Sequence, residues 1–93
     1  MIKEINVNDF CAVSGTATDK DAERLYDHIK YLTSDGATVV LDFSAIECVD
    51  LSFFKTILPH YYPPTKQLKF SNLSRFQKDL LKETYLCLIQ GVL

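Results

Sequence analysis

The first apolar positions of the chain fall in two short runs, residues 2–7 and 10–13, on either side of Asn8 and Asp9. Short apolar runs that flank a turn-forming pair are typical of two strands joined by a tight turn. The pattern therefore predicts that the chain opens with a hairpin.

Apolar residues next recur at helical spacing: Ala22, Leu25, Tyr26, Ile29 and Leu32. Thr18 is a good N-cap, Asp19 and Asp21 would lie near the positive end of the helix dipole, and Gly36 would stop the run. These signals predict an amphipathic helix over residues 19–34.

Residues 38–44 are rich in β-branched side chains and are apolar on both alternating sets in their first half. This predicts a central strand covered on both faces. A short connection leads to a second helix, which begins at Asp50 or Ser52 and must end by Pro59. Apolar residues of this helix include Phe53, Phe54, Ile57 and Leu58. They surround more of its circumference than one buried face needs, so we expect some of them to be exposed as a partner site.

Residues 67–73 alternate as another strand, and Ser74 with Gln77 is the signature of a capping box for a third helix, with Phe76 and Leu80 facing inward. Residues 86–93 fit either the tail of this helix or a last strand, and Gly91 favours the strand. The predicted order is ββαβαβα with a possible final strand. We expect one α/β domain over residues 1–93, with a mixed β-sheet, right-handed crossovers and packed helices.

The carboxyl ends of the strands are the usual place for ligands and partners in open α/β sheets, which singles out residues 47–54. Asp50 would cap the second helix by accepting a bond from the amide of Ser52 or Phe53, while Val49 would pack on Phe54. Ser52 would then lie in an exposed first turn as a candidate phosphorylation site. The alternative interpretation is that Asp50 and Ser52 only cap the helix.

Asp42, at the end of the central strand, would bind the amides of the following loop, or would be catalytic if a second acid or a histidine lay nearby. Ser14, Thr16, Asp42 and Asp50 are the residues that would line a crevice for a small ligand or a nucleotide. The histidines and cysteines lack the spacing of a metal site, and the glycines lack that of a phosphate loop, so we expect neither a metal nor a cofactor.

Size, charge and cysteine content limit the kinds of function and the cellular location that we expect. The chain has 93 residues, 47% of them hydrophobic, and a net charge of −2, which predicts one small core and disfavours a nucleic-acid binder. Residues 1–50 carry ten acids and four bases, whereas residues 51–93 carry two acids and six bases. We expect a cytoplasmic location without membrane insertion, because no signal peptide or apolar span is seen and the three cysteines suit a reducing compartment.

Several segments together resemble STAS domains, the fold shared by sulphate-transporter tails and anti-sigma-factor antagonists. Ala12 to Gly15 is similar to the v-x-G that opens those domains, residues 38–46 to their central strand with its aspartate, and Cys48 to Ser52 to their fiDSSG motif. Residues 68–74 and 80–86 are similar to the family's later strand and closing helix.

The resemblance implies a non-enzymatic regulatory or scaffolding protein that binds a partner through the second helix and the loop before it. The partner would be a histidine-kinase-like ATPase or a transporter ATPase, and the contact residues would be Val49, Asp50, Leu51, Ser52, Phe53 and Phe54. In antagonists of this family the serine after the aspartate is phosphorylated, but here that position holds Leu51. A small-ligand or nucleotide sensor, or a subunit of a transporter ATPase complex, is the alternative, and the sequence leaves monomer or dimer open.

Overall fold

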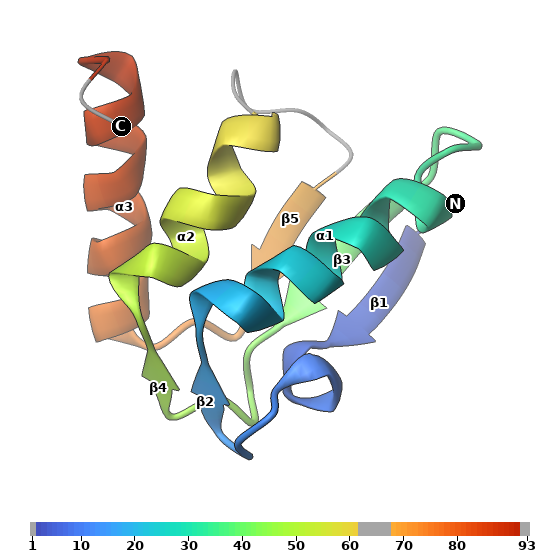
Figure 1. The fold of residues 1–93 in the computed structure, drawn as a ribbon, viewed down its shortest axis with the longest axis horizontal. Coiled ribbons are helices and arrows are strands. Elements are labelled where there is room, and N and C mark those ends of the chain that lie inside the picture. The colour runs from blue at the N-terminus through green and yellow to red at the C-terminus, as the bar shows by residue number, and fades with distance from the viewer. Residues whose placement is uncertain (1, 62–67, 92–93) are drawn as a thin grey trace.

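The computed structural model describes residues 2–61 and 68–91. Three parallel strands form its main sheet in the order β1-β3-β5, with β1 over Ile2–Asn6, β3 over Thr38–Asp42 and β5 over Leu68–Ser71 (Figure 1). The predicted central strand is therefore the middle one. A second, two-stranded sheet pairs β2 (Thr16–Ala17) with β4 (Cys48–Val49), also in parallel.

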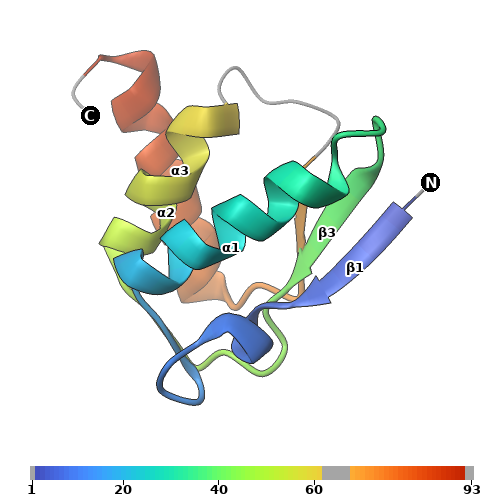
Figure 2. The same cartoon turned by 45° about the vertical axis from the view of Figure 1, so that its right-hand side comes forward.

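Three helices accompany the sheet: α1 over Asp19–Leu32, α2 over Leu51–Ile57 and α3 over Arg75–Ile89. Figures 1 and 2 show α1 and α2 on one face of the sheet, with α3 beside α2 at the end of the helix layer. The element order confirms the α/β class. A short 3₁₀ helix, Leu58–Tyr61, continues α2 past Pro59.

The predicted opening hairpin is wrong. Strand β1 pairs in parallel with β3, so that Ile5 lies opposite Leu41, and residues Val7–Phe10 form a 3₁₀ helix. All strand pairs in the described residues are parallel, and antiparallel pairing there is limited to an isolated bridge between Val13 and Thr16. The sheets are therefore parallel, not mixed, because the residues that would form the turn and begin the second hairpin strand, Val7–Phe10, adopt a 3₁₀ helix instead.

Local signals fix the helix ends well. Asp21 and Thr18 form a capping box at the start of α1, and Ser74 and Gln77 form the predicted one at the start of α3. Helix α3 continues to Ile89, so residues 86–89 are the tail of this helix and the prediction of a last strand is wrong for residues 86–91. Residues 92 and 93 lie outside the described residues. Gly91, at φ +71°, follows the C-cap Gln90 in the left-handed conformation that commonly ends a helix.

The core lies between the sheet and the helices. Its fully buried large side chains include Leu25, Ile29, Leu41, Phe43, Phe53, Phe54, Ile57 and Leu58. Only alternate residues of β3, Val39 and Leu41, are buried, whereas Val40 between them is partly exposed. The expectation that both faces of the central strand are covered is therefore wrong for the described residues, since their helices lie on one face.

Helix α2 is apolar on several sides because it is the middle helix of the layer. It packs against α1, against α3 and over the sheet, and Phe53, Phe54 and Ile57 are all fully buried. The expectation that Phe53 or Phe54 is exposed is wrong, and Leu58 is buried as well. Among the helices in the described residues, none is long and apolar enough to cross a membrane.

Candidate functional site

The starts of α1 and α2 are held side by side by the small β2–β4 sheet. Thr16 lies opposite Cys48 and Ala17 opposite Val49, so each strand leads directly into its helix. The carbonyl of Gly15 accepts bonds from the amides of Glu47 (2.8 Å) and Cys48 (3.0 Å). The predicted site at residues 47–54 is thus built on backbone hydrogen bonds at the carboxyl end of the main sheet.

Asp50 is the N-cap residue of α2, but its side chain makes no capping bond. Its amide donates to the carbonyl of Ala17 (3.1 Å), and its carbonyl accepts from the amide of Phe53 (3.0 Å). The predicted bond from the carboxylate to Ser52 or Phe53 is therefore wrong, because the Phe53 amide already has a backbone acceptor. The carboxylate of Asp50 stays exposed to solvent.

The predicted contact residues separate into two groups by burial. Val49, Phe53 and Phe54 are buried, so their side chains cannot meet a partner while the helix layer is intact. Asp50 and Leu51 are exposed and Ser52 is partly buried. Leu51, 37% exposed, is the one large apolar side chain of α2 that its neighbours leave open. The surface available at this helix start comprises Glu47, Cys48, Asp50, Leu51, Ser52 and Lys55.

Asp42 binds a backbone amide of the loop that follows β3, as the first of its two interpretations predicted. Its Oδ1 atom accepts bonds from the side-chain amide of Asn72 (2.9 Å) and from the backbone amide of Ser44 (2.9 Å). The bond from Asn72, followed by the bond from Ser44, lowers the pKa of Asp42. The carboxylate therefore ties the ends of β3 and β5 together, with Asn72 in a left-handed conformation at φ +57°.

The predicted ligand crevice is not formed by the described residues, in which no pocket is detected. Ser14 is exposed and its hydroxyl oxygen accepts a bond from the side-chain amide of Asn8 (3.4 Å), while Thr16 is engaged in β2. Asp42 has its bonds to Ser44 and Asn72 instead. Ligand sensing through Ser14, Thr16 and Asp42 has no observation here in its favour.

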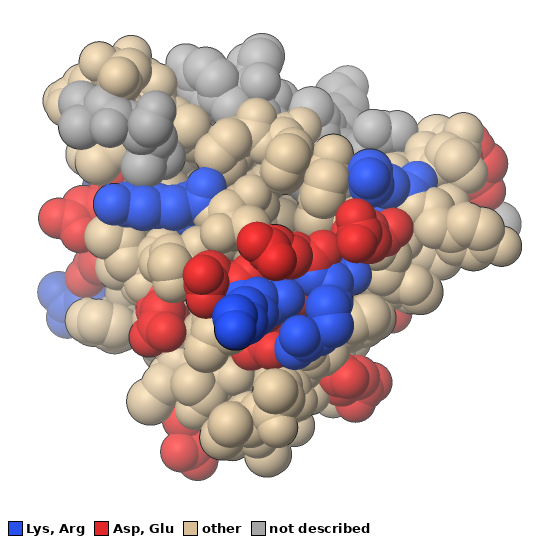
Figure 3. Space-filling view, in the orientation of Figure 1, with Lys and Arg blue, Asp and Glu red and all other residues tan. Residues whose placement is uncertain are grey.

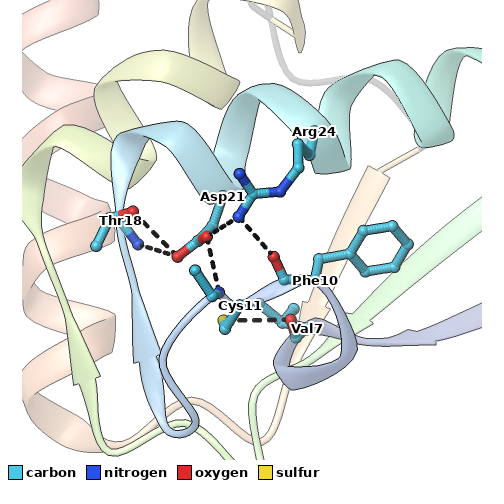
Figure 4. Close-up of polar contacts among 7 residues, drawn as sticks. Val7, Phe10, Cys11, Thr18, Asp21 and Arg24 are labelled. Atoms are coloured by element: carbon cyan, nitrogen blue, oxygen red, sulfur yellow. Dashed lines mark hydrogen bonds and ion pairs between the residues drawn. The ribbon is translucent and has the colours of Figure 1, made fainter.

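A buried carboxylate at the start of α1 is the polar centre that sequence reasoning missed (Figure 4). Asp21 is only 2% exposed and accepts bonds from the backbone amides of Thr18 (2.9 Å) and Ala12 (3.2 Å), from the Thr18 hydroxyl (3.0 Å) and from the Arg24 guanidinium. Arg24 also donates to the carbonyl of Phe10 (3.2 Å). This network, which we call the Asp21 network, pins the loop after β1 to α1.

Burial by itself raises the pKa of Asp21, but the bonds from Thr18, Ala12 and Arg24 outweigh it and lower the pKa overall. The carboxylate therefore stays ionised and accepts bonds without moving a proton at neutral pH. Cys11, beside it, has its pKa raised by burial and then by the negative charge of Asp21. A thiol with a raised pKa is a poor nucleophile, so this cluster is suited to holding the loop and not to covalent chemistry.

The remaining chemistry-bearing side chains are dispersed. No group of three or more His, Cys, Asp or Glu residues in the described ranges could hold a metal ion. His28 packs against Phe10 with ring centroids 5.1 Å apart, and His60 stacks on Tyr26 at 3.8 Å. Figure 3 shows acidic and basic side chains interleaved over α1, so the face that it presents is not a patch of one sign.

No family model, no curated protein and no solved structure matches this chain.

Proposed function

We propose that this chain is a non-enzymatic regulatory or scaffolding domain that binds a partner protein through the first turn of α2 and the loop before it. One observation carries the proposal. Leu51 is an exposed apolar side chain, whereas the other large apolar residues of α2 are buried. Its neighbours in the sequence include four polar residues: Glu47, Asp50, Ser52 and Lys55. An apolar anchor inside a polar rim is the usual anatomy of a protein interface.

The resemblance to STAS antagonists supports the same surface. Leu51 stands at the position at which those antagonists carry the serine that a kinase-like partner phosphorylates. We therefore propose constitutive docking by Leu51, on a partner such as a histidine-kinase-like ATPase or a transporter ATPase. Ser52, partly exposed next to Asp50, remains the candidate modification site, because an added phosphate would bring like charge to the rim.

Leu51→Asp is expected to reduce partner capture at least tenfold, because it places a charge in the apolar centre of the contact. The melting temperature should fall by only a few degrees, since the residue is exposed. The measurement is affinity capture from the native cell with quantitative mass spectrometry, which also reports phosphate on Ser52. Tyr31→Asp, at an exposed position near the far end of α1, is the matched control. Equal capture by the Leu51 variant and the wild type would refute this surface.

A further inference from the structure

The uncovered face of the main sheet calls for an explanation. Sheets in which all strands are parallel occur almost only with both faces covered. Here the described helices cover one face, as Figures 1 and 2 show. Alternation along the strands places the following residues on the other face: Ile2, Glu4, Asn6, Thr38, Val40, Asp42, Lys69 and Ser71.

The strand register sets these residues in rows across the sheet. In one row Glu4 of β1, Val40 of β3 and Lys69 of β5 lie side by side. The next row holds Asn6, Asp42 and Ser71. The first row thus carries a negative charge on one outer strand, a positive charge on the other and an apolar, partly exposed valine between them.

We propose that this face, the Glu4–Val40–Lys69 face, binds the same face of a second copy of the chain. The two copies would be related by a two-fold axis that runs along β3 between the sheets. Such an axis exchanges the outer strands, so Glu4 of each copy lies opposite Lys69 of its partner and Val40 meets its own counterpart. The same rotation sets Asn6 opposite Ser71, a pair of polar groups able to exchange a hydrogen bond.

The charge pattern selects this arrangement over its alternative. An in-plane axis at right angles to the strands would set β1 on β1, and Glu4 would then face Glu4 while Lys69 faced Lys69. With the axis along β3, the sheets stack at about 10 Å and the long Glu and Lys side chains can span that gap. The Glu4–Lys69 and Asn6–Ser71 contacts each occur twice, as in other isologous interfaces, whereas Val40 on the axis meets its counterpart once.

Two features limit the strength of the contact. The face is three strands wide, with a spacing of about 4.8 Å, and four or five residues long at about 3.3 Å each, which is small for a stable interface. Asp42 also lies on the proposed axis, so it faces its own counterpart two residues beyond Val40. Its bonds to Ser44 and Asn72 hold the charge in place. We therefore expect a weak dimer that assembles with rising protein concentration.

Sedimentation equilibrium of the purified chain from about 10 µM to about 1 mM is the test, since these concentrations span the dissociation constants of a weak dimer. The wild type should shift from monomer to dimer. Glu4→Lys and Lys69→Glu should each weaken the dimer at least tenfold by creating like-charge pairs, and the double variant should return to within threefold of the wild type. Asp42→Asn, which keeps an acceptor oxygen, should tighten it.

Glu23→Lys, an equal charge reversal at an exposed position on α1, is the matched control and should leave the dissociation constant unchanged. Circular dichroism melts of every variant show that each is folded. A wild type that stays monomeric to the highest concentration overturns the proposal. So do single reversals without effect, a double variant without recovery, or an Asp42 variant that does not tighten the dimer. None of these results bears on Leu51, which belongs to the helix layer.

Discussion

Phe54→Ala is expected to lower the free energy of unfolding by about 4 kcal/mol, the typical cost of removing a buried aromatic ring. The ring is fully buried and belongs to a cluster of four phenylalanines that joins α2 to the sheet. Its centroid lies 5.5 Å from that of Phe53, 5.9 Å from that of Phe70 and 6.0 Å from that of Phe43. Truncation leaves a cavity beside these three rings, which the surrounding core holds in place, so collapse around it is restricted.

A loss of this size is a large share of the stability of a 93-residue chain, which by its length is roughly 5–14 kcal/mol. Phe54→Leu should cost about 1–2 kcal/mol, so it gives a folded variant if the alanine variant unfolds. Leu51→Ala, on the same helix but exposed, should cost under about 1 kcal/mol and is the control. Chemical denaturation measures all three. Equal losses at residues 51 and 54 would contradict the burial described for α2.

Asp21→Ala is expected to lower the free energy of unfolding by about 3 kcal/mol, because it leaves several buried partners without an acceptor. The amides of Thr18 and Ala12 lose their bonds, the capping box of α1 is broken, and Arg24 loses its carboxylate. For a chain of this size, the melting temperature should fall by roughly 12–24 °C. Asp27→Ala, at an exposed position six residues further along α1, should change the melting temperature little.

The same carboxylate predicts how stability depends on pH. Its pKa is lower in the folded chain than in the unfolded chain, so its ionised form stabilises the fold above the unfolded value and this contribution is lost as pH falls through the folded value. The difference in stability between the wild type and Asp21→Asn should therefore be constant near neutral pH and shrink below about pH 4. A difference that persists undiminished in acid would show that the charge of Asp21 contributes nothing.

Sequence patterns predicted the elements whose signals are local. The helical spacing of Leu25 and Ile29, with Thr18 before them, predicted α1, and the Ser74–Gln77 capping box predicted the start of α3. The β-branched side chains of residues 38–44 predicted the strand β3 itself. These predictions succeeded because caps and periodicity act within a few residues of each other.

The predictions that failed depend on which elements become neighbours. The pattern predicted that some of the apolar residues of α2 are exposed, because one buried face would not accommodate them all, but α2 has neighbours on several sides and all four are buried: Phe53, Phe54, Ile57 and Leu58. Phe76 was expected inside, yet it is 69% exposed, because Gln77 takes the buried face of α3 and donates to the carbonyl of Ile46 at 3.1 Å. Hydropathy could not have predicted that a buried amide replaces an aromatic ring.

The Asp21 network was missed for a related reason. Asp21 was interpreted as a first-turn acid that faces the helix dipole, whereas its partner Ala12 lies nine residues earlier in a loop. The spacing Thr18-x-x-Asp21 was the available signal, since an acid at the third helical position completes a capping box. The sequence placed the candidate docking segment, but only packing could show that Leu51, and not Phe53, is its accessible apolar residue.

The pairing of Gly15 and Ala17 with residues 47–50 has a consequence for how this surface can evolve. The bonds that shape the turn before α2 run from backbone to backbone, so they persist when the side chains of Glu47, Cys48 or Asp50 are exchanged. Substitutions there alter the chemistry that a partner meets without reshaping the turn that presents it. Through the proposed docking surface, descendants of this chain could thus acquire new partners by changing a few exposed side chains, and we expect the backbone amides of Glu47, Cys48 and Asp50 to stay protected from hydrogen exchange in all of them.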